Sequence, residues 1–217
     1  MMIISIPKSA STSLMQTIAK ILDIKYQNGI SRKKYFIDVP EYSEMQSYHG
    51  TTVRRSKEFL TKWISRKDII YKEHLLPTKE HIDYIRKINK PVVILLRKVD
   101  HVIDNYLQSI EKFKSGKMDL REQKGLIIKK LIKIDYEKLK KEYFEFNKLW
   151  IESRLKNVLY VNFDDLILKY NRVMRMILDH YGYPEAKIIP LMKAKGNRGD
   201  YNTYTGIGEK RLKRQIC

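Results

Sequence analysis

Short, uninterrupted apolar runs alternate with longer stretches of helical periodicity along most of this chain. The first run, Met1 to Ile6, is followed by Thr12 to Asp23, where apolar residues recur at the spacing of a helix. The same order returns at Val92 to Leu96, which also precedes a helical pattern. Each of these units predicts a strand, a polar turn and a helix.

Two shorter apolar runs, Ile69 to Tyr71 and Val158 to Val161, predict further strands. Uninterrupted apolar strands that alternate with helices favour a parallel sheet whose two faces are both covered. We therefore predict an α/β fold with a parallel central sheet and helices on both faces. No linker rich in Pro, Gly or Ser divides the 217 residues, which predicts a single domain over residues 1–217.

The remaining regions differ in how clearly they predict structure. Lys124 to Arg154 predicts one or two amphipathic helices, and Asn171 to Tyr181 predicts a helix that Gly182 ends. Asn28 to Lys57 is polar and aromatic without a clear period. The segment from Lys193 onwards lacks periodicity and contains several glycines, so it predicts a loop.

Charge is the most unusual feature of the composition, because 44 Lys and Arg against 25 Asp and Glu give a net charge of +19. Such a field suits an anionic partner, which includes nucleic acid, an anionic membrane surface and a phosphate-rich small molecule. The sequence is also rich in Ile, Asn and Tyr, and an A+T-rich coding sequence produces such a composition, including many lysines, without selection for an anionic partner. The charge alone therefore does not identify the partner.

Cysteine content and apolar run length narrow the cellular context. The only cysteine is Cys217, which excludes an intramolecular disulfide framework and a cysteine-based zinc cluster. No apolar run is long enough to span a bilayer, and no charged leader precedes a secretory apolar segment. These observations predict a soluble, cytoplasmic protein without a transmembrane segment.

The turn after the first strand gathers the side chains that bind anionic oxygens. It contains Lys8 and four hydroxyl groups, those of Ser9, Ser11, Thr12 and Ser13. Ligands of open α/β sheets bind at the carboxyl ends of the strands, where the free N–H groups of a helix start can hold phosphate. A helix-capping cluster with a solvated lysine is the alternative interpretation. The glycines of a Walker A loop are absent, which disfavours ATP-type phosphoryl transfer.

The residues of this turn resemble a loop of a known enzyme family. Pro7 to Leu14 has the sequence PKSASTSL, which is similar to PKSGTTWL, the 5′-phosphosulfate loop of sulfotransferases that use 3′-phosphoadenosine 5′-phosphosulfate (PAPS). Tyr71 to Pro77, with the sequence YKEHLLP, is similar to the K-T-H-L-P element of that family, whose histidine is the catalytic base.

Further segments follow in the order that the family has. Arg97, after a buried strand, and Asn105 resemble its 3′-phosphate segment, in which serine usually occupies the second position. Val158 to Leu166, VLYVNFDDL, resembles the strand that ends in Y-E-D-L. Lys195 to Thr205, KGNRGDYNTYT, is similar to the RKGxxGDWKNxFT loop. The resemblance spans nearly the whole chain and implies a P-loop-like sulfotransferase architecture.

The resemblance also implies a role for individual residues. His74 is expected to take the proton of the attacking hydroxyl, Lys8 to balance charge on the leaving phosphate, and Lys72 to orient the transferring group. The other residues expected to bind the donor are Ser9, Ser11, Thr12 and Ser13 at the 5′-phosphate, Arg97, Asn105, Lys195 and Gly196 at the 3′-phosphate, and Phe163 beside the adenine. The resemblance implies no metal.

Several positions depart from the family pattern. Ala10 replaces glycine, Ser13 replaces the tryptophan that stacks on adenine, Ala194 replaces arginine and Asn202 replaces lysine. Part of the adenine stacking and one phosphate-binding cation are therefore missing, which weakens the expected grip on the donor.

The sequence thus favours a PAPS-dependent sulfotransferase that moves a sulfuryl group to a hydroxyl acceptor and releases 3′-phosphoadenosine 5′-phosphate (PAP). A carbohydrate acceptor is weakly favoured because Asn28 to Lys57 is polar and rich in tyrosine. The alternatives are a nucleotide or sugar kinase of the P-loop type, and a non-enzymatic basic protein that binds nucleic acid or an anionic surface. The partners expected under the favoured hypothesis are the donor nucleotide and the acceptor, not nucleic acid.

Overall fold

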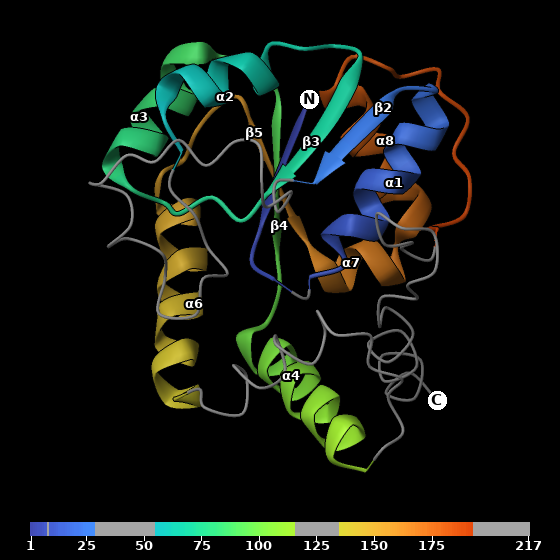
Figure 1. Ribbon diagram of the computed structural model, residues 1–217. Helices are drawn as coiled ribbons and strands as arrows, with labels where there is room; N and C mark the ends of the chain where they lie inside the picture. The colour runs from blue at the N-terminus through green and yellow to red at the C-terminus, as the bar shows by residue number, and fades with distance from the viewer. Residues whose placement is uncertain (8, 29–54, 116–134, 193–217) are drawn as a thin grey trace.

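A five-stranded sheet forms the centre of the molecule (Figure 1). The computed structural model describes residues 1–7, 9–28, 55–115 and 135–192. The strand order is β2-β3-β1-β4-β5, and every neighbouring pair is parallel. The strands are β1 (Met2–Ser5), β2 (Lys25–Asn28), β3 (Ile69–Glu73), β4 (Val92–Leu96) and β5 (Val158–Asn162).

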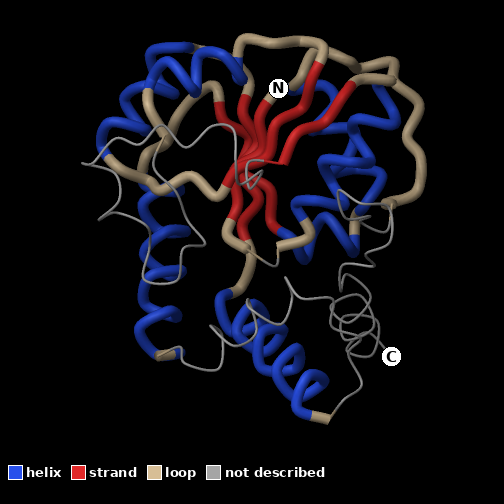
Figure 2. Tube along the Cα trace, in the orientation of Figure 1, coloured by secondary structure: helices blue, strands red, loops and turns tan. Residues whose placement is uncertain are grey.

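Helices cover both faces of this sheet, as Figure 2 shows. One face packs against α2 (Lys57–Ile64), α3 (Lys79–Ile88), α4 (Val99–Lys114) and α6 (Tyr136–Glu152). The other packs against α1 (Ser11–Leu22), α7 (Phe163–Leu168) and α8 (Tyr170–His180). The predicted α/β fold, with a parallel central sheet and helices on both faces, is confirmed.

The central strands are apolar without interruption because both of their faces are buried. All residues of β1 and β3 are buried, so an alternation of apolar and polar positions would place polar groups in a core. Strand β3 is the exception, since its last residues, Lys72 and Glu73, are charged and buried. Such residues are seldom buried without partners, which makes the end of this strand a candidate site.

The chain reverses its direction across the sheet between β1 and β4. After β1 it proceeds through α1 to β2 at one edge, whereas after β4 it proceeds through α4 and α6 to β5 at the other edge. Ligands of open α/β sheets bind at such a reversal, outside the carboxyl ends of the strands. The ladder pairs Ile4 with Glu73 and Ser5 with Leu95, which brings the ends of β1, β3 and β4 to one level.

Some elements differ from the sequence-based expectation. The helix expected within 124–154 is described as α6 over Tyr136–Glu152, and the helix expected at 171–181 is α8, which ends before Gly182 at a φ of 85°. Elements β2, α2, α3 and α7 were not predicted. Strand β2 is a short edge strand with exposed residues, and α3 is so polar that its apolar stripe is narrow. Across the described ranges, no helix has the length and apolar character that a membrane crossing requires.

Candidate functional site

His74 lies directly after β3 and is held by the end of β1. Its Nδ1 is 2.7 Å from the carbonyl oxygen of Ser5. Because a carbonyl oxygen only accepts hydrogen bonds, this contact places the imidazole proton on Nδ1. The unprotonated Nε2 then faces the ammonium group of Lys72 at 3.5 Å. The imidazole therefore presents a basic nitrogen to a cation.

Lys72 connects this histidine to the first turn of α1. Its Nζ lies 3.3 Å from Oγ1 of Thr12, in addition to the contact with Nε2 of His74. The side chains of Lys72 and His74 point to the same face of the sheet because they are two residues apart along an extended chain. Three residues singled out from the sequence, Thr12, Lys72 and His74, thus form one continuous row of contacts.

Burial shifts the proton affinity of both basic groups in the row. Burial lowers the pKa of Lys72 to about 8, although the nearby carboxylate of Glu73 acts to raise it. The pKa of His74 lies well below its usual 6.5, because burial and the charge of Lys72 both disfavour the imidazolium, while its hydrogen bond to Ser5 opposes them. At neutral pH the site therefore combines a neutral imidazole with a charged ammonium group.

The turn between β1 and α1 has the geometry of an anion-binding helix start. Ala10 adopts a left-handed conformation with a φ of 59°, and no side chain caps the N-terminus of α1. The first N–H groups of a helix have no partner within the helix, so those of Ser11, Thr12 and Ser13 can donate to an anion. Within the described residues, the buried hydroxyl of Ser13 also has no hydrogen-bond partner.

Ser9 supports this turn from within. Its hydroxyl donates to the carbonyl oxygen of Ile6 at 2.7 Å, and the residue is fully buried. The Ser9 side chain is therefore engaged with the backbone of the turn, whereas Ser13 has an unused hydroxyl. Lys8, expected beside the leaving phosphate, lies outside the described residues.

Arg97 follows β4 and packs on Phe163 of α7. The centre of its guanidinium lies 4.0 Å above the ring centroid, and both residues are buried. Burial lowers the pKa of Arg97 to about 10, although the charge of Asp164 acts to raise it, so the group is a cation at neutral pH. One face of Phe163 is therefore covered by Arg97, and the ring belongs to the core around α1, α7 and α8.

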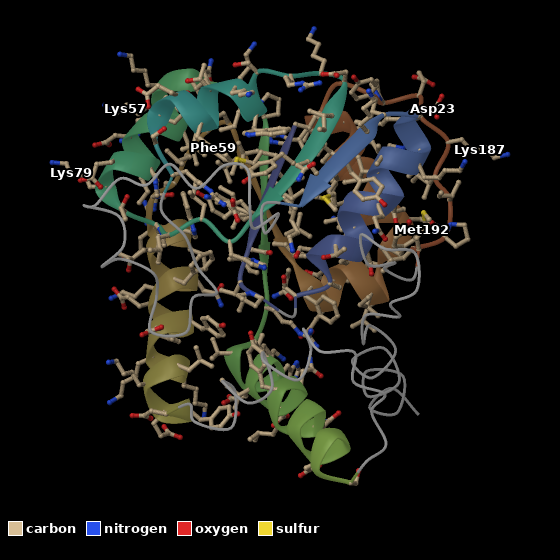
Figure 3. All side chains as sticks on the ribbon, in the orientation of Figure 1. Asp23, Lys57, Phe59, Lys79, Lys187 and Met192 are labelled. Carbon is tan, nitrogen blue, oxygen red and sulfur yellow. The ribbon has the colours of Figure 1, made fainter. Side chains whose placement is uncertain are left out.

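The remaining expected donor-binding residues lie further along the chain. Asn105 is half-buried on α4. Lys195 and Gly196 lie outside the described residues. The last described residue, Met192, donates its backbone N–H to Oγ1 of Thr17 on α1 at 2.9 Å (Figure 3). Met192 is thus fixed to the same helix that begins at the turn between β1 and α1.

Several residues of the site were not predicted from the sequence. Ser5 fixes the imidazole through its carbonyl group, and Asn147 of α6 donates its side-chain amide to the carbonyl of Arg97 at 2.9 Å. Backbone acceptors give no sequence signal, and Asn147 lies in a helix expected to be scaffold. Glu73 carried a signal, since it and Lys72 are charged residues at the end of a strand that begins with apolar residues. Groups of three or more His, Cys, Asp or Glu that could hold a metal are not found in the described ranges.

The chain is similar in structure to two sulfotransferases. Mouse sulfotransferase SULT7A1 complexed with PAP has 14% identity and a TM-score of 0.47, over 100% of this chain and 63% of the mouse chain. A sulfotransferase from Alicyclobacillus acidocaldarius has 13% identity and a TM-score of 0.49, over 87% of this chain and 85% of the other. The chain thus spans less than two thirds of the mouse protein's length. No family model and no curated protein matches the sequence.

Proposed function

We propose that this protein is a PAPS-dependent sulfotransferase that transfers a sulfuryl group to a hydroxyl acceptor. The observation that carries the proposal is the row of contacts from Ser5 through His74 and Lys72 to Thr12. It joins the sequence element that resembles the family's catalytic histidine to the one that resembles its 5′-phosphosulfate loop. The two elements are about 60 residues apart in the sequence, and each resembles its family motif by residue type alone.

The donor would bind across the carboxyl ends of β1 and β4. The N–H groups that open α1 and the hydroxyl of Ser13 offer donors for the 5′-phosphate, and Arg97 offers a cation for the 3′-phosphate. The guanidinium is held against Phe163, so it loses little freedom when it meets an anion. We further propose that the donor-binding site also includes Lys8, Asn105, Lys195 and Gly196.

In the proposed reaction, the acceptor hydroxyl attacks sulfur while the bond from sulfur to the phosphate oxygen breaks. His74 Nε2 takes the hydroxyl proton, a new oxygen–sulfur bond forms, and PAP leaves with the electron pair of the broken bond. The transferring group brings negative charge within reach of His74, and this charge raises the pKa of the imidazole and so strengthens it as a base. Lys72, next to both Thr12 and His74, balances charge that develops between the attacking and leaving oxygens.

Nucleotide binding provides the first test of the proposal. PAP should raise the free energy of unfolding by about 2.7 kcal/mol at 100 times its dissociation constant. AMP is the matched ligand, because it lacks only the 3′-phosphate that Arg97 is proposed to hold. We expect AMP to bind at least about tenfold more weakly, the loss of one charge-assisted contact of about 1.5–3 kcal/mol. Thermal denaturation with each nucleotide measures both quantities.

Transfer of radiolabelled sulfate from PAPS to pooled hydroxyl compounds provides the second test, and it also identifies the acceptor class. Stabilisation by ATP rather than PAP would favour the kinase alternative. Tight, salt-dependent binding of DNA or RNA without a response to PAP would favour the basic binding protein. Either result would overturn the proposal.

A further inference from the structure

Glu73 occupies the position between the two basic residues of the site, but its side chain points to the opposite face of the sheet. Along β3, Lys72 and His74 share one face, whereas Tyr71, Glu73 and Leu75 share the other. The Glu73 side chain is 1% exposed. A buried carboxylate needs several donors to offset the loss of hydration, so its surroundings show what it holds in place.

One carboxylate oxygen of Glu73 is held by two side chains of the far face. Its Oε2 accepts a hydrogen bond from Nε of Arg55 at 2.8 Å and lies 2.7 Å from Nη2 of the same guanidinium. The hydroxyl of Tyr71 donates to the same oxygen. Burial alone would lower the pKa of Arg55, but the charge of Glu73 and these hydrogen bonds raise it, so the guanidinium is charged at neutral pH.

Aromatic packing fixes the two side chains that hold the carboxylate. The ring of Tyr71 stacks on Trp63 with a centroid distance of 5.2 Å and an interplanar angle of 19°. The guanidinium of Arg55 lies 4.6 Å above the ring of Phe59. Both supports belong to α2, which packs on this face of the sheet. The carboxylate is therefore anchored to a rigid part of the core.

The second carboxylate oxygen of Glu73 contacts the backbone of the candidate base, His74. Glu73 Oε1 accepts from the backbone N–H of His74 at 3.1 Å. The ladder between β1 and β3 ends at the pair of Ile4 and Glu73, so the N–H of His74 follows the last paired residue. The anchored carboxylate thus fixes the backbone one residue beyond the last strand pair, at His74.

We propose that Glu73 is a positioning residue, whose carboxylate is anchored by Arg55 and Tyr71 and holds the backbone of His74 so that Nε2 stays directed at Lys72. The inference rests on the proposed function for the catalytic meaning of that direction. Glu73 itself touches neither the donor nor the acceptor in this scheme. Glu73 therefore affects the proposed reaction only through the orientation of the His74 imidazole.

The substitution Glu73→Gln tests this role, because an amide has one acceptor oxygen where a carboxylate has two. The glutamine can accept from the Arg55 and Tyr71 side or from the N–H of His74, but not from both. We expect kcat to fall about 100-fold, as small misplacements of a catalytic group can cause. The dissociation constant of PAP should stay within twofold, because Glu73 does not face the donor site.

Asp68→Asn is the matched control, since it makes the same chemical change at the opposite end of β3. Asp68 is an exposed carboxylate that pairs with Arg66. We expect it to leave kcat and PAP affinity within twofold of the wild type. If Glu73→Gln does not fold, Tyr71→Phe decides, because it keeps the ring on Trp63 and removes one donor to the carboxylate. That variant should lower kcat by a smaller factor at unchanged PAP affinity.

The histidine tautomer gives a readout that does not depend on activity. Nitrogen-15 NMR of the His74 side chain should show a proton on Nδ1 in the wild type and in Asp68→Asn, and a mixture of tautomers in Glu73→Gln. An unchanged tautomer together with an unchanged kcat would overturn the positioning role. If the wild type transfers no sulfate from PAPS, the proposed function fails, and the NMR comparison alone still decides whether Glu73 orients the imidazole.

Discussion

Two buried histidines, His74 directly after β3 and His81 in the first turn of α3, have different hydrogen-bond partners. His74 and His81 are 5% and 4% exposed, and each has its Nδ1 2.7 Å from a backbone carbonyl oxygen, that of Ser5 or that of Leu76. At His81 the second nitrogen also meets backbone, 3.1 Å from the N and 3.0 Å from the carbonyl oxygen of Arg55. At His74 the second nitrogen meets the ammonium group of Lys72 instead.

The difference shows what distinguishes a structural histidine from a candidate base. Burial and one fixed nitrogen are common to both, so neither property identifies the functional residue. The partner of the other nitrogen separates the two, because Nε2 of His81 meets backbone atoms whereas Nε2 of His74 faces the side-chain cation of Lys72.

The largest effect is expected from removing the imidazole of His74. His74→Ala should reduce sulfate transfer from PAPS by at least about 100-fold, the usual contribution of a general base. PAP affinity should change by less than twofold, since the imidazole is not among the groups proposed to bind the donor. Radiolabelled transfer and titration calorimetry measure the two quantities. Transfer close to the wild-type rate would remove His74 from the proposed mechanism.

His81→Ala should show the reverse pattern. The change leaves partly buried backbone groups of Leu76 and Arg55 without their partner, which should destabilise the fold by about 1–2 kcal/mol. Urea denaturation measures this loss. Transfer per folded molecule should stay within a few fold of the wild type. A loss of turnover as large as that of His74→Ala, in a stable variant, would abolish the contrast between the two histidines.

The pH dependence of kcat/KM should report the cation beside His74. With the pKa of Lys72 at about 8, its ammonium is present below that pH and is lost as the pH rises through it. The imidazole, with a pKa well below 6.5, remains a base throughout this range. The rate should therefore be level from pH 6.5 to about 7.5 and fall above pH 8. In Lys72→Arg the fall should disappear, because a guanidinium keeps its charge.

The smallest effect is expected at the turn that carries Thr12. Ala10 has a φ of 59°, a conformation that costs an alanine about 1–2 kcal/mol. After the greater chain entropy of unfolded glycine is allowed for, Ala10→Gly should stabilise the protein by about 0.5–1 kcal/mol. Ala19→Gly, inside α1, is the matched control and should destabilise it by about 0.5–1 kcal/mol. Thermal denaturation that gave the same sign for both variants would contradict the account of this turn.

Periodicity was enough to predict a parallel sheet covered on both faces, because strands buried on both faces are apolar throughout. Two strand-to-helix units that position the site, β1 with α1 and β4 with α4, follow from that pattern alone. It failed at β2, where an edge strand needs few apolar residues, and at α3, whose polar surface hides a narrow apolar stripe. The short helix α7 was missed because its N-terminal cap, Asn162, is also the last residue of β5, so no turn separates the two elements.

The residues of the candidate site that carry a distinctive side chain could be named from the sequence, whereas those that act through backbone groups or contacts on the far face of the sheet could not. Lys72, His74 and Thr12 were named from their resemblance to known motifs, and they lie in contact. Ser5 contributes only a carbonyl group, and Arg55 reaches Glu73 from a region without clear periodicity. Such contributions depend on the register of the strands and on packing across the sheet, which no local pattern contains.

The hydrogen bond from His74 to Ser5 also joins two neighbouring strands beyond their last backbone pair. Ser5 is the final residue of β1 and leads straight into the turn that opens α1, so the imidazole is fastened to the root of that turn. A displacement of the turn when a nucleotide arrives would therefore move the ring with it. Binding of the donor and alignment of the proton acceptor would then be coupled through the side chain of His74.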